Sequence, residues 1–450
     1  MKKVLLISPS YLYHESTPPI GIGYIASALE GIGIKVELID CHITPDYKKK
    51  ILSLLPDCPT VGISVNAGTV SSALDIAKAI RTISPQTRII MGGPQATAVY
   101  EKFIPEYADV VVRGEGEDTI VELMQEEDLS KINGIAYWDS GIKLNPDRAL
   151  IENLDRLRFP VWHLYKLKKY KYAESLVPLA LITTSRGCPN DCIYCTKCIH
   201  GYKIRFRSIE NLLDEIEFLV NRFGVKEISF IDDNLFYYPE RIKELFSNII
   251  TRNWKNLFFS LLVDPNFGDF EIFKLAAQAK VRVVIFAIES GSQEVLSKLG
   301  RKLNFEKLKE RIKMARQAGL KVNASFILGF PFDTIDTMQE TIDLADNLPI
   351  TWAYFFIAIP FPGTKFYELV EEKGKFLCDL STTSIGYNQK AVYEMGLLKA
   401  KDVEMMYLRA MRKFYFSPRR TWLLLHPLLR FKSFKTISNA IKRSSRLISK

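Results

Sequence analysis

Four cysteines lie close together near the middle of the 450-residue chain, and cysteine thiolates are strong metal ligands. Cys188, Cys192 and Cys195 form a C-x3-C-x2-C array, and Cys198 follows three residues later. Three thiolates this close on one loop cannot all pair with one another as disulfides. They can hold an iron–sulfur cluster or, with a fourth ligand, a zinc ion. The glycine and proline on either side of Cys188 favour a turn in which the sulfur atoms converge.

The spacing favours a cluster over a zinc site. A structural zinc site is usually built from two separated pairs of ligands, and no further C-x2-C pair occurs outside this loop. Three ligands leave one iron of a four-iron cluster without a protein sulfur, so that iron is open to a substrate or cofactor. A zinc-stapled membrane adaptor without catalysis is the alternative of another class.

The aromatic residue Tyr194 precedes the third cysteine, and C-x3-C-x-aromatic-C resembles the signature of the radical S-adenosylmethionine (radical SAM) enzymes. The resemblance implies that Cys188, Cys192 and Cys195 hold a [4Fe-4S] cluster whose open iron is chelated by S-adenosylmethionine (SAM), with Tyr194 beside the adenine. It further implies an electron donor such as flavodoxin or ferredoxin. Reductive cleavage of SAM then gives a 5′-deoxyadenosyl radical, which abstracts hydrogen from an unactivated carbon.

The composition is that of a globular protein with a neutral body and a basic end. Hydrophobic residues make up 47% of the chain and charged residues 25%, which is ordinary for such proteins. Of the 61 Lys and Arg, nine lie between Arg419 and Lys450 without any acid, so the other 418 residues carry 52 basic and 51 acidic groups. We therefore expect no nucleic-acid partner. The scattered Cys41, Cys58 and Cys378 suit a reducing cytoplasm, and no run approaches the roughly 20 apolar residues of a membrane span.

Short apolar segments alternate with amphipathic segments in the first 125 residues. Helices are predicted near 19–31, 46–55, 69–82, 97–104 and 117–125, and strands at Val4–Ser8, Lys35–Ile39, Thr60–Val65, Arg88–Gly92 and Asp109–Arg113. Buried strands joined by helices predict a flavodoxin-like, doubly wound parallel sheet. Ligands of such sheets bind beyond the carboxyl ends of the strands.

Small residues follow several of these strands, so a large flat ligand can approach the backbone closely. Together, Pro18-Pro-Ile-Gly-Ile-Gly, Ser64, Gly92-Gly93-Pro94 and Arg113-Gly-Glu-Gly-Glu117 resemble the cobalamin-binding domain that is fused to one large class of radical SAM enzymes. The resemblance implies that cobalamin contacts Ser64, Gly92, Gly93, Gly114 and Glu115.

The sequence departs from the wider cobalamin-domain pattern, because Asp-x-His-x-x-Gly is absent after the first strand. The usual histidine ligand to cobalt is therefore not assured. His14 and His42 lie on the appropriate side of the sheet, but each is expected to be an ordinary loop histidine. Gln95 stands where relatives often have histidine.

The alternation restarts near residue 177, after a connector that contains a predicted hairpin of Ile132–Trp138 and Ile142–Leu144. Strands are predicted at Pro178–Thr184, Glu227–Asp232, Phe258–Val263, Val283–Glu289, Val322–Leu328 and Trp352–Ile359, with helices near 208–223, 239–252, 268–279, 292–299, 304–318 and 335–347. Six such units indicate a partial (βα)6 barrel of the TIM type, whose chemistry lies at the carboxyl ends of the strands.

Carboxylates stand at two of these strand ends. Asp232 and Asp233 follow one strand and Glu289 ends another, although an aspartate pair there can also simply cap the next helix. In the resembled family, the Asp-Asp end faces the SAM amine, the Glu-Ser-Gly end faces the ribose, and the fifth and sixth strand ends flank the adenine. The resemblance therefore implies SAM contacts from Asp232, Glu289, Ser290, Ile327 and Pro360.

Arg205 and Arg207 are capable of steadying a carboxylate, but we expect them to be solvated surface residues. Aromatic residues such as Phe236 and Phe286 suggest an apolar pocket, although aromatic residues at strand ends more often serve packing. After Lys365 we expect helices without further strand–helix units.

From Trp422 onward, apolar residues recur at near-helical spacing among Lys and Arg. This pattern is typical of an amphipathic helix at an anionic membrane surface, where each basic group contributes about 1 kcal/mol. A helix docked on the barrel explains it equally well. The expected domains are a cobalamin-binding domain (1–130), a hairpin and linker (131–176), a radical SAM barrel (177–365) and a helical region with a basic tail (366–450).

The resemblance spans residues 3 to about 418 and implies a cobalamin-dependent radical SAM enzyme that methylates an unactivated carbon of a small molecule. If the basic tail anchors this cytoplasmic protein at the inner face of the membrane, an apolar, lipid-like substrate is favoured. The alternative with the same cofactors is ring formation or rearrangement of a carbon skeleton. A tRNA methylthiotransferase is disfavoured, because it needs an amino-terminal trio of cluster cysteines and that half of the chain has only Cys41 and Cys58.

Overall fold

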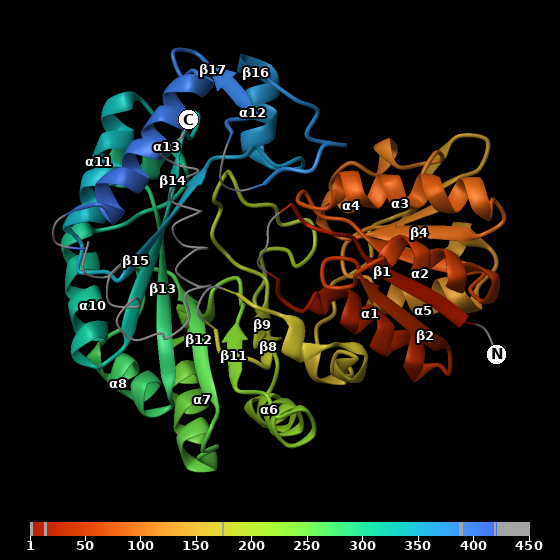
Figure 1. Ribbon diagram of the computed structural model, residues 1–450, viewed down its shortest axis with the longest axis horizontal. Helices are drawn as coiled ribbons and strands as arrows, with labels where there is room; N and C mark the ends of the chain where they lie inside the picture. The colour runs from red at the N-terminus through yellow and green to blue at the C-terminus, as the bar shows by residue number, and fades with distance from the viewer. Residues whose placement is uncertain (1–2, 13–15, 173–174, 387–389, 418–419, 421–450) are drawn as a thin grey trace.

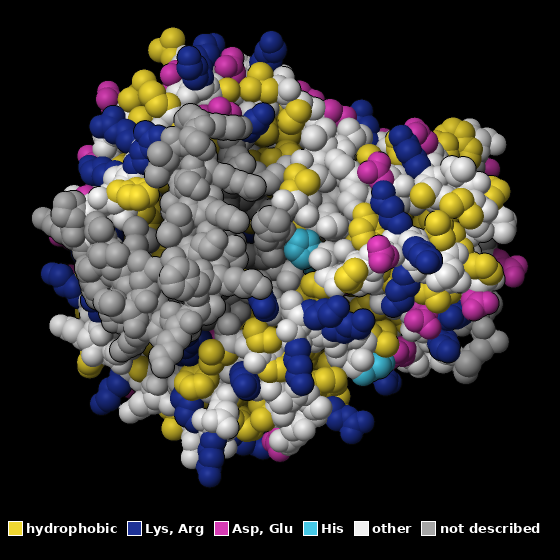
Figure 2. All heavy atoms as spheres, in the orientation of Figure 1, with side chains coloured by type: hydrophobic (Ala, Val, Ile, Leu, Met, Phe, Trp, Pro, Cys, Tyr) yellow, Lys and Arg dark blue, Asp and Glu magenta, His cyan; other side chains and the backbone are white. Residues whose placement is uncertain are grey.

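The computed structural model of the chain describes residues 3–12, 16–172, 175–386, 390–417 and 420, which form two large sheets side by side (Figure 1). His14 and the basic segment from Trp422 onward lie outside the described residues. Figure 2 shows basic and acidic side chains interspersed over the coloured part of one face, in keeping with the near-neutral charge of residues 1–418.

The first sheet confirms the prediction of a flavodoxin-like, doubly wound fold. Its parallel strands are β1 (Lys3–Ser8), β2 (Lys35–Asp40), β3 (Thr60–Ser64), β4 (Arg88–Gly92) and β5 (Val110–Val112), and they lie in the order β2-β1-β3-β4-β5. The crossovers are the helices α1 (Ile20–Gly31), α2 (Tyr47–Leu54), α3 (Val70–Ile83), α4 (Pro94–Ala98) and α5 (Glu117–Gln125). The strand order reverses between β1 and β3, where such folds bind ligands.

The side chains of β1 point alternately to the two faces of the sheet, and those on both faces are apolar, which explains why helices cover both faces. Val4 and Leu6 belong to the same buried cluster as α1 and α5, whereas Leu5 and Ile7 belong to the cluster of α2 and α3. Successive residues of a strand point to opposite faces, so an uninterrupted apolar run requires cover on both sides. The cluster under α1 and α5 is continuous with the core of the second sheet.

Two details of this half differ from the prediction. The helix expected at 97–104 is replaced by the short α4 and a single 3-10 turn at Tyr100–Lys102, because Pro94 favours a helix start directly after Gly93. The predicted hairpin forms as β6 (Ile135–Trp138) and β7 (Ile142–Leu144), but it also pairs antiparallel with β5 and extends the sheet to seven strands.

The second sheet confirms the partial barrel. Its six strands are all parallel, in the order β15 (Trp352–Ile357), β14 (Lys321–Leu328), β13 (Val281–Glu289), β12 (Phe258–Val263), β11 (Glu227–Phe230) and β8 (Leu179–Ile182). Around it lie the helices α6 (Ile209–Phe223), α7 (Pro239–Arg252), α8 (Phe270–Gln278), α9 (Gln293–Lys298), α10 (Phe305–Gln317) and α11 (Ile335–Asn347).

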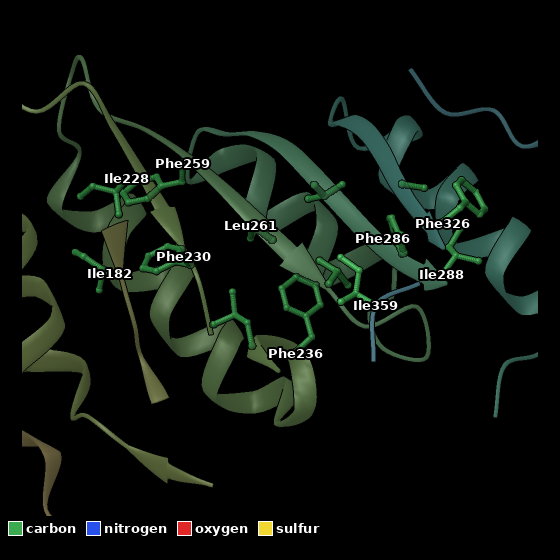
Figure 3. Close-up of a cluster of buried hydrophobic side chains, with 14 of the residues drawn as sticks. Ile182, Ile228, Phe230, Phe236, Phe259, Leu261, Phe286, Ile288, Phe326 and Ile359 are labelled. Carbon is green, nitrogen blue, oxygen red and sulfur yellow. The ribbon is translucent and has the colours of Figure 1, made fainter. Parts of the chain in front are cut away.

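Aromatic side chains fill the space between this sheet and its helices (Figure 3). Phe230 and Phe259 stack with ring centroids 5.5 Å apart, and Phe286 packs against Phe273 of α8 at 6.2 Å. Phe236 contacts the same Phe273 at 6.2 Å. The packing interpretation of Phe236 and Phe286 is therefore correct.

The region after Lys365 contains α12 (Lys365–Lys373) and α13 (Ala400–Tyr415), in agreement with the expected helical region, but it is not made of helices alone. Two three-residue strands, β16 (Gly374–Phe376) and β17 (Tyr393–Met395), form an antiparallel pair between them. The segment between these strands reaches back to the first sheet, where Gln95 Nε2 donates to the Leu380 carbonyl at 2.8 Å. In the part of the chain that is described, no helix has the length and apolar character needed to cross a membrane.

Candidate active site

A cavity of about 610 Å³ lies between the carboxyl ends of the two sheets, and residues of both sheets line it. The first sheet contributes the ends of β3, β4 and β5, and the second contributes the cysteine loop and the ends of β11, β12 and β13. Most of the predicted site residues meet there, namely Ser64, Gly92, Gly93, Gly114, Glu115, Cys188, Cys192, Tyr194, Cys195, Asp232 and Glu289.

The cysteine loop is tied down at its base. The two-residue strands β9 (Ser185–Arg186) and β10 (Arg205–Phe206) pair antiparallel, and Gly187 adopts φ +94°, a conformation that favours glycine. The Gly187 amide donates to Asp233 Oδ2 at 3.0 Å, so a carboxylate at the end of β11 holds the loop at the rim.

The three motif thiols line the wall of the cavity. Cys188 and Cys192 are buried, whereas Cys195 is exposed, and burial raises the pKa of Cys192 above the ordinary value. Cys198 lies outside this wall, with its Sγ 3.7 Å from the Pro94 carbonyl. Among the described residues, no three His, Cys, Asp or Glu side chains form a group that could hold a metal ion.

Asp232 has one occupied and one free carboxylate oxygen. Oδ1 accepts from the Thr184 amide at 2.9 Å, the Thr184 hydroxyl at 2.7 Å and the Ser185 hydroxyl at 2.6 Å. Oδ2 is buried and has no hydrogen-bond partner among the described residues. Burial raises the pKa of this carboxyl above its ordinary value, against the effect of the three donors. A buried unpaired oxygen is costly unless a ligand satisfies it.

A second polar group lies around Glu289. Arg301 Nη1 is 3.9 Å from the Glu289 carboxylate and donates to the Tyr194 hydroxyl at 3.2 Å, and Arg301 Nη2 is 3.9 Å from Asp264. Glu289 has φ +71°, which costs a residue with a side chain about 1–3 kcal/mol. Burial raises the pKa of Glu289, against the opposing effect of Arg301. A strained, buried carboxylate of this kind is typical of a functional position.

The remaining predicted SAM residues do not line the cavity. Ser290 is fully buried, lies 3.3 Å from the Thr341 hydroxyl and accepts from the Ser292 amide at 3.1 Å. Ile327 is partly buried and packs against the core, and Pro360 is buried. The structure thus brings together the ends of β11 and β13 at the cavity, but not these positions on β14 and after β15.

Two glycines of the first sheet leave no room for a side chain. At Gly93, with φ +105°, a Cβ atom would lie 2.7 Å from the Val65 carbonyl oxygen. Gly62, in the middle of β3, also lines the cavity, and a Cβ there would lie 2.6 Å from Leu6 Cδ2. The cavity therefore extends beneath the sheet, between β3 and the isoleucines of α1 and α5.

Glu115 and the two arginines after the cysteine loop differ from expectation. Arg205 and Arg207 were expected at the surface, but both are buried and each binds a carboxylate. Arg205 lies 2.7 Å from Glu115 Oε2, and Arg186 lies 2.8 Å from Glu115 Oε1. The partner of Arg205 is 90 positions away in the sequence, whereas Arg207 binds Glu215 of α6, only eight residues further on.

Of the two histidines on the appropriate side of the sheet, the structure describes only His42. His42 does not line the cavity, and its ring contacts Tyr11 edge-on at 5.9 Å. Its Nδ1 is nevertheless buried without a hydrogen-bond partner among the described residues.

Sequence reasoning missed several polar residues that line the cavity: Asn190, Lys197, Asn234, Asp264 and Arg301. Asp264 directly follows β12 as Asp232 follows β11, so the rule that chemistry lies at strand ends was sufficient to find it. Arg301 comes from the loop between α9 and α10, for which the sequence carries no comparable signal.

Comparisons with known proteins agree with this geometry. The family model of the Radical SAM superfamily matches residues 182–345, and that of the B12 binding domain matches residues 13–124. An uncharacterized methyltransferase of Pyrococcus horikoshii is 32% identical over 383 residues, which cover 81% of this chain and 82% of that protein. The anaerobic magnesium-protoporphyrin IX monomethyl ester cyclase of Rubrivivax gelatinosus is 26% identical and covers 83% and 70%, respectively.

The fold has a solved counterpart. The structure of the radical SAM methyltransferase TsrM from Kitasatospora setae, with cobalamin and a [4Fe-4S] cluster bound, matches with a TM-score of 0.74 at 18% identity and covers all of both chains. The two-part architecture, the cysteine loop at the cavity and the identity to the archaeal methyltransferase lead to one assignment. The chain belongs to the cobalamin-dependent radical SAM enzymes, a family of methyltransferases and related cyclases.

Proposed function

We propose that this enzyme methylates an unactivated carbon of a small apolar molecule and holds its cluster, SAM and cobalamin together in the cavity between the two sheets. The observation that carries the proposal is the shared cavity, in which glycine-rich strand ends face the cysteine loop. When bound, the cluster and SAM supply radical chemistry and cobalamin supplies the methyl group, while the protein binds, orients and excludes water.

The thiols of Cys188, Cys192 and Cys195 are the proposed cluster ligands. All three line the cavity, and the loop that carries them is fixed through Gly187 and Asp233. As described, the thiols do not form a metal-binding group, so they must move closer together to hold one cluster. Thiolates are the usual protein ligands of such clusters. A fourth motif thiol is not required, which leaves Cys198 outside the ligand set.

Asp232 is the proposed acceptor for the SAM amine. The residue lines the cavity, and its Oδ2 is buried and has no partner in the described chain, so a cationic amine would satisfy it. Glu289 and Arg301 offer an acceptor and a donor for the ribose hydroxyls and the SAM carboxylate. Tyr194 is the proposed neighbour of the adenine, because it lines the cavity between Arg301 and Phe330.

The proposed corrinoid contacts are Ser64, Gly92, Gly93 and Gly114, to which we add Gly62, since it lines the same cavity. These positions combine close backbone approach with an aliphatic wall from α1 and α5. Glu115 fits this role poorly, because both of its carboxylate oxygens already bind arginines. We therefore assign it to the protein's own framework.

Methyl transfer is favoured over ring formation by the identity to the archaeal methyltransferase, whereas the similarity to the cyclase keeps cyclisation as the second candidate. Incubation with SAM labelled in its methyl group, a reductant and cell extract distinguishes the two. Label in a product other than SAM, methionine or methylcobalamin supports methyl transfer. A product of altered mass without label would contradict it and favour cyclisation.

The substrate is proposed to be apolar because large apolar side chains remain exposed at the cavity. Ile231 after β11 is 39% exposed and Leu262 of β12 is 41% exposed, and both line the cavity. A lipid-like substrate would also fit contact of the basic segment 419–450 with a membrane. Sedimentation with anionic vesicles tests that contact: loss of binding on truncation at residue 418 supports it, and equal binding contradicts it.

A further inference from the structure

Arg186 reaches from the cysteine loop of the second sheet into the first. It stands two residues before Cys188, and its guanidinium binds Glu115 at 2.8 Å and Glu117 at 2.6 Å. The same guanidinium lies over the Tyr24 ring of α1 at 5.1 Å. The side chains of Arg186, Glu115 and Glu117 are 7%, 2% and 8% exposed, respectively. One side chain thus contacts two elements of the amino-terminal half while its backbone belongs to the cysteine loop.

The acidic partners belong to the loop that carries the proposed corrinoid contact Gly114. Glu115 follows Gly114 directly, and Glu117 is the first residue of α5, so its charge also suits the helix amino terminus. Glu115 is fixed further by Arg205 at 2.7 Å and by the Ile151 amide at 2.8 Å. Although burial opposes ionisation, Arg205 and Arg186 hold the pKa of Glu115 below its ordinary value.

On its other side, the arginine segment is held by the barrel. The Ser185 hydroxyl donates to Asp232 Oδ1 at 2.6 Å, and the Gly187 amide donates to Asp233 Oδ2 at 3.0 Å. Residues 185–187 therefore connect the aspartates after β11 to the glutamates after β5. The connection runs through the hydrogen bonds of this three-residue segment and the buried guanidinium of Arg186. Removing one partner from a buried arginine that binds two carboxylates costs stability, because the charged group left without its partner remains buried away from water.

We propose that Arg186 is a positioning residue that couples the cluster site to the corrinoid site. Ligation of Cys188 would order the segment that carries Arg186, and the ordered guanidinium would then fix the Gly114–Glu117 loop in the conformation that receives the corrinoid. Binding at one site must then favour binding at the other by the same factor. The inference rests on the cofactor set proposed above.

The experiment measures the affinity for hydroxocobalamin of cluster-loaded and cluster-free full-length protein by absorbance titration. In the wild type we expect affinity about 5-fold or more higher in the loaded form, the lower end of typical coupling. Arg186→Lys keeps the charge but loses the planar, two-pronged guanidinium. We expect it to bring the ratio of the two affinities, cluster-loaded over cluster-free, close to one. Reciprocally, hydroxocobalamin should slow the loss of iron to a chelator in the wild type but not in this variant.

Arg207→Lys is the matched control. Arg207 is equally buried and binds Glu215 at 2.5 Å, but that pair lies within the barrel. The variant removes a buried guanidinium of comparable exposure and should keep the wild-type ratio of loaded to cluster-free affinity. If Arg186→Lys does not fold, Glu117→Gln decides, because it removes one charge and leaves the Glu115 pair in place.

The outcomes separate this inference from the proposed function. A ratio of one in the wild type, or an unchanged ratio in Arg186→Lys and Glu117→Gln, would overturn the coupling. A wild-type protein that binds no hydroxocobalamin in either form would instead overturn the proposed cofactor set.

Discussion

Replacing Cys192 with alanine is expected to abolish reductive cleavage of SAM. Cys192 is buried and lines the cavity together with the other two motif thiols, and without it the cluster would keep only two of its three proposed thiolate ligands. Loss of a group that acts as part of a unit removes most of the rate, roughly 10³-fold or more. The measurement is the formation of 5′-deoxyadenosine and methionine by anaerobically reconstituted protein, together with its iron and sulfide content.

Cys198→Ala provides the control, because Cys198 lies in the same loop but outside the cavity wall. It should retain iron, sulfide and SAM cleavage close to the wild type. If Cys192→Ala retained undiminished cleavage, the three-thiol assignment would be wrong. Loss of the cluster in Cys198→Ala would place the ligand set elsewhere in the loop.

Replacing Gly62 with leucine is expected to weaken corrinoid binding strongly while the cluster is retained. The new side chain would project toward Leu6, with its Cβ 2.6 Å from Leu6 Cδ2, and would occupy the part of the cavity beneath the sheet. Overpacking costs about 1–3 kcal/mol, and where the bound corrinoid bears this cost it corresponds to a loss of about 5- to 150-fold in affinity. Leucine suits a strand better than glycine, so the protein should still fold. Absorbance titration with hydroxocobalamin and a thermal melt measure the two effects.

Gly21→Ala is the matched control for this variant. Gly21 lines the same cavity from α1, but a Cβ there would have no atom within 4 Å. It should bind hydroxocobalamin as the wild type does. Wild-type affinity in Gly62→Leu would show that the corrinoid does not occupy the part of the cavity beneath β3.

The fold could be predicted from the sequence to a large extent, because strands buried on both faces appear as uninterrupted apolar runs. Phe258–Val263 is an example, since the predicted and observed bounds of β12 coincide. The pairing of β6 with β5 and the short β16–β17 pair were not predictable in this way. Both depend on contacts between distant segments, and three-residue strands carry too few residues for a period to be recognised.

The residues of the candidate site were predictable where a reactive side chain lies at a strand end or within a recognisable motif. Asp232, Glu289 and the three thiols reach the cavity as expected. Ser290 does not, because Thr341 of α11 and the Ser292 amide take up its hydrogen bonds. Burial of Arg205 and the role of Arg301 depend on partners such as Glu115 and Tyr194, about 90 to 107 positions away in the chain.

The most direct test of the account is the cofactor content of full-length protein reconstituted anaerobically with iron, sulfide and hydroxocobalamin. If three thiols hold a four-iron cluster in the cavity that also receives the corrinoid, each chain should retain about four iron, four sulfide and one corrinoid. A single zinc per chain without sulfide, or a complete cluster with no corrinoid retained, would contradict it.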